Sequence, residues 1–173
     1  MIKEDVTMIR IGIVGSGFAA QLHLDSYRQL GMKDVELAAI CSKDDTLQEI
    51  ADQWQIPRVY DDFDKLLADP QIDLVDIITP PALHEMMVVR AMEADKHVIC
   101  EKPLTGFFAP AVREDGQAVP CTEMYEKADQ SLRAIRAAME KTGKRFFSAE
   151  NYVYAPSVQK CADLLKRKKS KIL

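Results

Sequence analysis

Short runs of apolar residues alternate along the chain with stretches in which apolar positions recur every three or four residues. The first pattern is typical of buried strands and the second of amphipathic helices. The predicted strands are Ile9–Val14, Val35–Ile40, Arg58–Tyr60, Leu74–Ile78, His97–Cys100 and Arg145–Ala149, and the predicted helices are Phe18–Leu30, Asp45–Trp54, Phe63–Ala68, Ala82–Ala94, a long one within Thr122–Lys141, and Pro156–Lys169. Strands this short and apolar are expected where helices cover both faces of a sheet. The alternation predicts an α/β fold with a doubly wound, mostly parallel sheet.

Two segments depart from this alternation. Thr105–Pro120 contains two glycines and two prolines and is predicted to be a loop after the fifth strand. Loops at that edge of such a sheet line the ligand crevice, so Phe107 and Phe108 either cover a ligand or anchor the loop to the domain. Near the other end, the basic run Lys166–Lys171 is expected to be a solvated helix end, and Ile172-Leu173 resembles the first step of a further strand.

Length and composition narrow the classes of protein. The 173 residues suffice for one full domain and little more. A net charge of −4 gives no reason to expect nucleic acid or an anionic membrane as partner, and no apolar run approaches the roughly 20 residues that span a bilayer. Cys41, Cys100, Cys121 and Cys161 are widely spaced and no histidine has metal-ligand spacing, so we expect reduced thiols, no metal and a cytoplasmic protein.

The first strand runs into a glycine-rich turn, Gly15-Ser16-Gly17, and then directly into the helix that opens with Phe18 and Ala19. Gly15 lets the backbone turn sharply, and Gly17 lacks a Cβ, so a pyrophosphate can approach the main chain. The unpaired N–H groups at the start of the helix then face the phosphates. In this β-α-β context the turn predicts a dinucleotide site in preference to a purely structural turn.

Two further segments carry candidate chemistry. After the second strand the chain reads Ser42-Lys43, where an NAD-specific site would place an acid for the ribose 2′-hydroxyl. A hydroxyl and a cation suit a 2′-phosphate, which favours NADP slightly over NAD, with a solvated turn lysine as the alternative. After the fifth strand, Glu101-Lys102-Pro103 places Lys102 at the mouth of the crevice. There an amine can exchange a proton with a substrate hydroxyl or polarise a carbonyl, although Glu-Lys-Pro by itself is typical of a surface turn.

The three histidines allow more than one role each. His23 lies within the first helix, where packing or a hydrogen bond is as plausible as contact with a ligand. His84 opens the helix after the crevice strand, which leaves a position on the cofactor side and a structural position both open. His97 starts a strand and is predicted to be structural.

Taken together, these motifs resemble the glucose–fructose oxidoreductase / inositol dehydrogenase family (Gfo/Idh/MocA) over about Met8 to Pro156. The resemblance rests on the glycine turn followed by His23, on Thr79-Pro80-Pro81 with His84, and on Glu101-Lys102-Pro103. The family transfers hydride between NAD(P) and a hydroxyl carbon of a sugar, a polyol or a related compound. The resemblance implies that Lys102 is the catalytic lysine, that Thr79, Pro80, Pro81 and His84 lie along the cofactor, and that Glu101 lies near its ribose.

The resemblance also implies a division of the chain. Members combine an N-terminal Rossmann domain with a C-terminal α+β domain, so residues 1–150 correspond to the NAD(P)-binding domain. Residues 151–173 begin the connection to a substrate domain that is absent here, together with its usual Asp and His acid/base pair. The chain is therefore expected to be the cofactor-binding portion of an oxidoreductase for a sugar-like substrate, with a homo-oligomer possible. A non-catalytic dinucleotide-binding module and a fragment of a longer enzyme are the alternatives.

Overall fold

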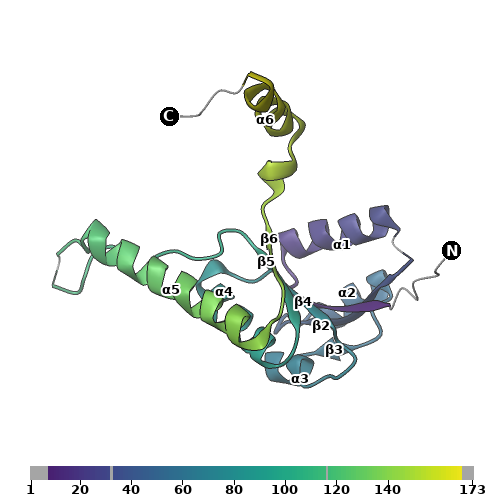
Figure 1. Ribbon diagram of the computed structural model, residues 1–173. Helices are drawn as coiled ribbons and strands as arrows, with labels where there is room; N and C mark the ends of the chain where they lie inside the picture. The colour runs from purple at the N-terminus through teal and green to yellow at the C-terminus, as the bar shows by residue number, and fades with distance from the viewer. Residues whose placement is uncertain (1–7, 32, 116, 169–173) are drawn as a thin grey trace.

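The structure, a computed structural model, describes residues 8–31, 33–115 and 117–168, in which strands and helices alternate (Figure 1). The strands are β1 (Ile9–Val14), β2 (Val35–Cys41), β3 (Val59–Tyr60), β4 (Leu74–Ile77), β5 (His97–Glu101) and β6 (Phe146–Ala149). The helices are α1 (Phe18–Leu30), α2 (Leu47–Trp54), α3 (Phe63–Leu67), α4 (His84–Glu93), α5 (Cys121–Thr142) and α6 (Pro156–Lys168), with 3₁₀ turns η1 (Pro81–Leu83) and η2 (Asn151–Tyr154).

The strands form one sheet in the order β3-β2-β1-β4-β5-β6, and every pairing between them is parallel. The chain builds outward from β1 to β3 and then crosses back to place β4 on the other side of β1. The predicted doubly wound, parallel sheet is therefore confirmed. Because the connections after β1 and β4 leave in opposite directions, a crevice opens at the carboxyl edge of the sheet between these two strands.

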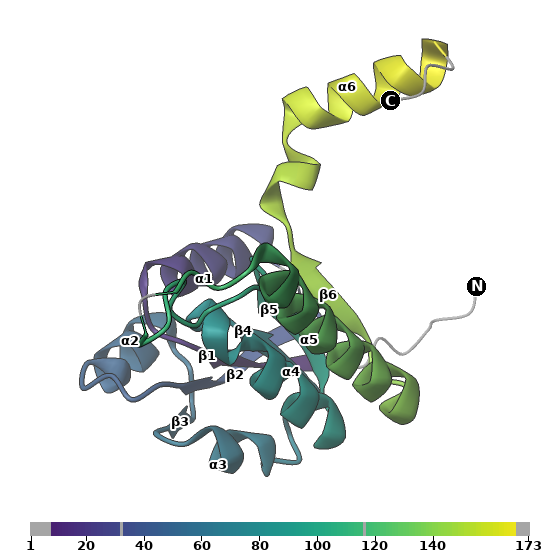
Figure 2. The ribbon, with the colours of Figure 1, turned by 90° about the vertical axis from the view of Figure 1, so that its left-hand side faces the viewer.

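Neighbouring residues of β1 face two different cores. Ile13 packs with Leu24 of α1 and with residues of α2, and all of this cluster is buried. The next residue, Val14, belongs to the opposite cluster with Leu66 of α3, Val88 of α4 and residues of α5. Helices α1 and α2 thus cover one face of the sheet and α3, α4 and α5 cover the other (Figure 2). Burial on both faces explains why the strand sequences are almost continuously apolar.

The predicted boundaries agree with the structure to within one residue for most elements, and two helices begin differently. The helix predicted at Asp45–Trp54 starts at Leu47, because the Asp44 carboxylate accepts hydrogen bonds from the backbone N–H and the hydroxyl of Thr46 (2.9 and 2.7 Å). This Asx turn holds the preceding residues out of the helix. The helix predicted at Ala82–Ala94 begins as the 3₁₀ turn η1 and becomes α-helical at His84.

Helix α6 stands away from the sheet and its covering helices, to which it is joined through β6 and η2 (Figures 1 and 2). Among the helices that the structure describes, none combines the length and the hydropathy needed to cross a membrane. The predicted strand start at Ile172-Leu173 lies outside the described residues, as does the basic run beyond Lys168.

Candidate dinucleotide site

The glycine turn is fixed to both neighbours of β1. Gly15 has φ +125°, and a Cβ there would lie 2.4 Å from the carbonyl oxygen of Ile78, just beyond β4. The N–H of Gly15 donates to the carbonyl of Cys41 (2.9 Å), and the N–H of Ile78 donates to the carbonyl of Val14 (2.8 Å). Only glycine can take this conformation so close to another strand. The backbone therefore turns at the point where the crevice opens.

The start of α1 presents unpaired donors to open space. Gly17 is the N-cap residue, no side chain caps the helix, and a Cβ on Gly17 would meet nothing within 4 Å. The N–H groups of Phe18 and Ala19 lie in the first turn, where a helix has no internal acceptor for them. This turn, which is fully described, contains no acidic residue. Free N–H groups, the positive end of the helix dipole and open space above Gly17 together fit a phosphate.

A cavity of about 580 Å³ opens in front of this turn. Gly15–Ala19 line one side of it, Ser42 and Lys43 a second side, and Thr79 and Pro80 a third. The structure thus brings together predicted residues from the ends of β1, β2 and β4. The cavity lies in the size range of pockets that hold small-molecule ligands and cofactors.

Sequence reasoning missed several residues of this cavity. Asp61, Phe63 and Met87 line it from the β3–α3 connection, α3 and α4. Cys41 also lines it, but burial and the nearby Asp62 and Asp61 raise the pKa of its thiol to about 11, so it is neutral. The predicted strand and helix ends contained no local signal for these contacts, because short β-α connections from different parts of the sequence meet only in the folded sheet.

A ring of hydrogen bonds joins the glycine turn to the β2–α2 loop. The Ser16 hydroxyl donates to Asp44 Oδ2 (3.1 Å) and lies 2.9 Å from the Ser42 hydroxyl, which accepts from the Asp44 N–H (3.2 Å). Because the Ser16 proton is committed to Asp44, the Ser42 proton is directed to Ser16. Hydrogen bonds from Thr46 and Ser16 lower the pKa of Asp44, which keeps it anionic at neutral pH. The ring fixes Ser16 and Ser42 relative to each other at the cavity rim.

His84 lies behind the cavity wall rather than at its surface. Its side chain is fully buried, with Nε2 2.8 Å from the carbonyl oxygen of Thr79 and Nδ1 2.9 Å from that of Pro103. The ring is therefore not exposed in the cavity, and a place for His84 along the cofactor stays a prediction. Pro81, which opens η1, does not line the cavity either. Through its contacts with Thr79 and Pro103, His84 holds the Thr79 segment beside the turn that contains Lys102.

Glu101 and Lys102 lie at the end of β5 but outside this cavity. Lys102 is exposed, and its backbone N–H donates to Glu101 Oε2 (2.7 Å). The other oxygen of Glu101 lies 3.1 Å from Nε2 of His23, whose Nδ1 is 2.8 Å from Asp76 Oδ2. Burial by itself would lower the pKa of His23, but hydrogen bonds and charge from Asp76 and Glu101 raise it to about 9. His23 is thus an imidazolium at neutral pH, and Glu101 faces it rather than the cavity.

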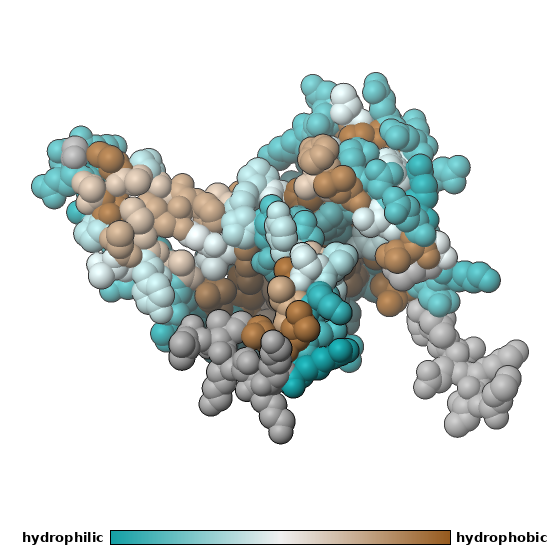
Figure 3. Space-filling view, turned by 90° about the horizontal axis from the view of Figure 1, so that it is seen from above, coloured by the Kyte–Doolittle hydropathy of each residue, from teal (hydrophilic) through white to brown (hydrophobic). Residues whose placement is uncertain are grey.

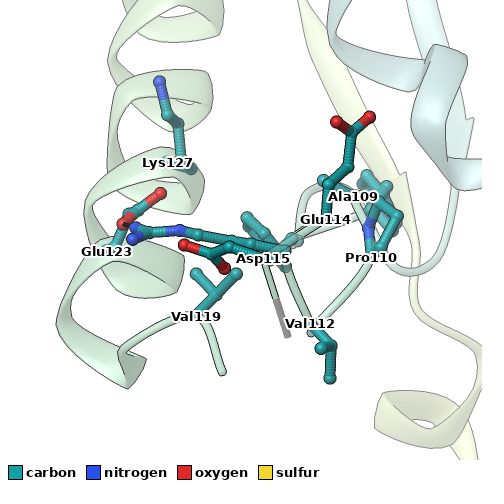
Figure 4. Close-up of a pocket in the computed structure, with 12 residues that line it drawn as sticks. Ala109, Pro110, Val112, Glu114, Asp115, Val119, Glu123 and Lys127 are labelled. Atoms are coloured by element: carbon teal, nitrogen blue, oxygen red, sulfur yellow. Dashed lines mark hydrogen bonds and ion pairs between the residues drawn. The ribbon is translucent and has the colours of Figure 1, made fainter. Parts of the chain in front are cut away.

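The described residues of the long loop Thr105–Pro120 do not line the cavity in front of the glycine turn. Phe107 and Phe108 line a separate hollow of about 780 Å³ between the loop and the start of α5 (Figure 4). An ion pair between Arg113 and Glu123 ties the loop to α5. Apolar residues gather on this arm of the molecule in the view from above (Figure 3). Phe108 is half-exposed and neither aromatic residue lines the dinucleotide cavity, so their position does not support a cover over that cavity.

Among the described residues, no group of three or more His, Cys, Asp or Glu side chains is arranged to hold a metal ion. The candidate residues for binding and chemistry lie in the glycine turn, the Ser42-Lys43 segment and the Glu101-Lys102 turn. These were all singled out by their position after a strand.

Comparison with known proteins identifies the architecture. The model of an oxidoreductase family with an NAD-binding Rossmann fold, GFO_IDH_MocA, matches residues 9–118, which is more than half of the chain. The chain belongs to the Gfo/Idh/MocA family. The resemblance drawn from the sequence motifs is confirmed, and the doubly wound sheet is the family's NAD-binding Rossmann fold.

Individual relatives cover most of this chain, while the chain covers a smaller part of each. An uncharacterized oxidoreductase of Rhizobium meliloti, ORF334, is 36% identical over 132 residues, 75% of this chain and 38% of that protein. Myo-inositol 2-dehydrogenase of Thermotoga maritima is 27% identical over 138 residues, which cover 76% of this chain and 41% of that protein. The crystal structure of an NAD binding oxidoreductase from Klebsiella pneumoniae has a TM-score of 0.73 and 28% identity, covering 93% of this chain and 39% of that one. The chain thus spans about two fifths of the length of these relatives.

Proposed function

We propose that this chain is the cofactor-binding portion of an NAD(P)-dependent oxidoreductase that transfers hydride to or from a sugar, a polyol or a related alcohol or ketone. The observation that carries the proposal is the cavity of about 580 Å³ at the glycine turn, where the uncapped start of α1 meets the open space above Gly17. The name of the Thermotoga relative, a myo-inositol dehydrogenase, supports a polyol-like substrate. When bound, the dinucleotide would supply the hydride acceptor or donor.

The protein's own residues would bind and orient the cofactor. Gly15–Ala19 would hold the pyrophosphate through backbone N–H groups, and Ser42 and Lys43 would contact the adenosine ribose or its phosphate. Thr79 and Pro80 would line the path on the opposite side of the crevice. We assign residues 1–150 to this binding unit and 151–173 to the connection that follows it, in keeping with α6 standing apart from the sheet.

Lys102 would hold or move the substrate proton. Its amine is exposed at the end of β5, in a turn that His84 links to the Thr79 side of the cavity. An ammonium there can polarise a carbonyl, and the same group can accept or return the proton of a substrate hydroxyl. A second candidate function, dinucleotide binding without turnover, is favoured by the position of Lys102 outside the cavity.

The chemistry of the cavity rim favours NADP slightly over NAD. Lys43 is exposed on the cavity and makes no ion pair within 4.0 Å among the described residues. The nearby Asp61 is already paired with Lys65 at 2.7 Å. A free cation beside the Ser42 hydroxyl suits a 2′-phosphate, whereas the Asp44 carboxylate is occupied by Thr46 and Ser16.

Titration with reduced dinucleotides tests both parts of the proposal. Calorimetry of the purified chain with NADPH and NADH is expected to show binding of both, with NADPH tighter, and Lys43→Asp is expected to reverse the order. Lys160→Asp on α6 is the matched control, since it changes the net charge equally and lies away from the cavity. Binding of neither dinucleotide would overturn the proposed function, and tighter NADH binding by the wild type would overturn the NADP preference alone.

Turnover separates the two candidate functions. In a longer form that includes a substrate domain, the oxidoreductase proposal expects hydride transfer with polyols such as myo-inositol, followed by absorbance of the reduced cofactor, and loss of that activity in Lys102→Ala. Dinucleotide binding by that longer form with no turnover on any sugar or polyol would support the binding module instead.

A further inference from the structure

An aspartate lies in the middle of the central strand β4, where the neighbouring residues are wholly apolar. Asp76 and its neighbours Val75 and Ile77 have no exposed surface. Oδ2 of Asp76 accepts a hydrogen bond from the Tyr27 hydroxyl (2.9 Å) and contacts His23, while Oδ1 has no hydrogen-bond partner among the described residues. Burying a carboxylate costs free energy that an apolar residue would avoid, so packing does not explain this side chain.

The bridge from Asp76 to Glu101 requires both nitrogens of His23 to donate. Nδ1 faces Asp76 and Nε2 faces Glu101, and only the imidazolium carries a proton on each nitrogen. In the neutral ring one bare nitrogen would face a carboxylate oxygen and repel it. Asp76 is held within the sheet, whereas Glu101 is the last residue of β5. Loss of the proton would therefore break the contact between His23 and Glu101.

Glu101 connects His23 to the backbone of the next residue, Lys102. One of its oxygens contacts His23, and the other accepts the backbone N–H of Lys102 at 2.7 Å. The two oxygens of a carboxylate lie in one rigid plane, so fixing the first fixes the direction of the second. The beginning of the Lys102 turn is thereby tied to a buried residue of β4, although the Lys102 side chain itself is exposed.

We propose that His23 is a positioning residue for Lys102, acting through its bridge between Asp76 and Glu101. The inference rests on the proposed function, in which Lys102 meets the substrate. Titratable groups near the bridge belong to several elements: Tyr27 on α1, Asp76 on β4, Cys100 and Glu101 on β5, and Glu150 and Tyr154, which line the same small hollow as His23.

Carbon-detected NMR of the cofactor-free chain tests the bridge, because carbon signals stay visible at high pH. We expect the His23 ring, the Glu101 carboxyl carbon and the Lys102 Cα to titrate together, with a common midpoint near the His23 pKa of about 9. In Glu101→Gln, the Lys102 Cα is expected to lose this titration while the chain stays folded. A Lys102 signal that ignores the His23 titration in the wild type would overturn the proposal.

A histidine variant provides the second test. His23→Gln is expected to abolish the titration at Lys102. The control His97→Gln lies at the start of β5, the strand that Glu101 ends, and is expected to leave the titration unchanged. His97 is a suitable control because its Nδ1 accepts only the Arg145 N–H at 3.0 Å, away from Lys102. Should His23→Gln fail to fold, the Glu101→Gln result still decides between coupling and its absence.

These measurements need no cofactor, so their outcome is independent of the proposed function. Coupled titration without dinucleotide binding would uphold the bridge and reject the oxidoreductase assignment. Dinucleotide binding without coupled titration would do the reverse. If both hold, turnover of a form that includes a substrate domain is expected to fall at saturating substrate with a midpoint near pH 9. In Glu101→Gln, this decrease at high pH is expected to be absent.

Discussion

Replacing Gly15 by alanine tests whether the glycine turn is required by the fold itself. The new Cβ would lie 2.4 Å from the carbonyl oxygen of Ile78, against at least 3.4 Å for an ordinary contact, and the residue would keep φ at +125°. The conformation costs about 1 to 3 kcal/mol for a residue other than glycine. Relieving the clash would also weaken two adjacent hydrogen bonds, Gly15 N–H to Cys41 and Ile78 N–H to Val14, at about 1 kcal/mol each.

The expected loss is therefore about 3 to 5 kcal/mol of unfolding free energy, a large share of the roughly 5 to 15 kcal/mol that stabilises a domain. Urea unfolding measures it, followed by the fluorescence of Trp54, the only tryptophan of the chain, and by circular dichroism. The midpoint should fall with an unchanged slope, because the surface exposed on unfolding stays the same.

Gly17→Ala is the matched control. Gly17 has φ −74° and open space where its Cβ would be, so alanine should cost at most about 1 kcal/mol through a poorer N-cap. The methyl group would nevertheless occupy the surface that a pyrophosphate needs, and dinucleotide affinity should fall about tenfold or more. The reasoning fails if Gly15→Ala loses under about 1 kcal/mol, or if Gly17→Ala is destabilised equally.

Three further predictions concern stability. The pKa of His23 is raised to about 9, so its contribution of about 3 kcal/mol is complete below its unfolded pKa of 6.5 and is lost as pH rises through about 9. Urea unfolding of the wild type should weaken over that range more than that of His23→Gln, and parallel curves would contradict it. Leu24→Ala, at a fully buried position of α1, should lose about 2 to 5 kcal/mol of unfolding free energy, while Leu22→Ala, at a half-exposed position, should lose far less. Equal urea midpoints for the two variants would contradict this. Asp62→Ala removes the side-chain cap of α3 and should cost about 1 kcal/mol, with the exposed Asp61→Ala as comparison and thermal unfolding as the measurement.

Local sequence patterns determined most of the architecture. The strand at Ile9–Val14, the glycine turn and the helix from Phe18 follow from apolar periodicity and from the special conformation of glycine, both of which act over a few neighbouring residues. Alternation of such segments leaves few topologies open, because parallel strands joined by helices cross over with one hand. The doubly wound sheet and the gathering of the turn with Ser42-Lys43 at its carboxyl edge could therefore be predicted.

The tertiary structure alone decided which polar side chains meet. His23, Asp76 and Glu101 come from three separate elements, and their contacts depend on β4 and β5 lying side by side beneath α1. An acid within the apolar run of β4 was a signal in the sequence, but it named no partner. In the same way, only the fold shows that His84 is buried between the backbone carbonyls of Thr79 and Pro103. Periodicity encodes which way a side chain faces along its own element, whereas its partners are set by the order in which strands assemble, and that order also decides whether a polar residue binds a ligand or holds the site in place.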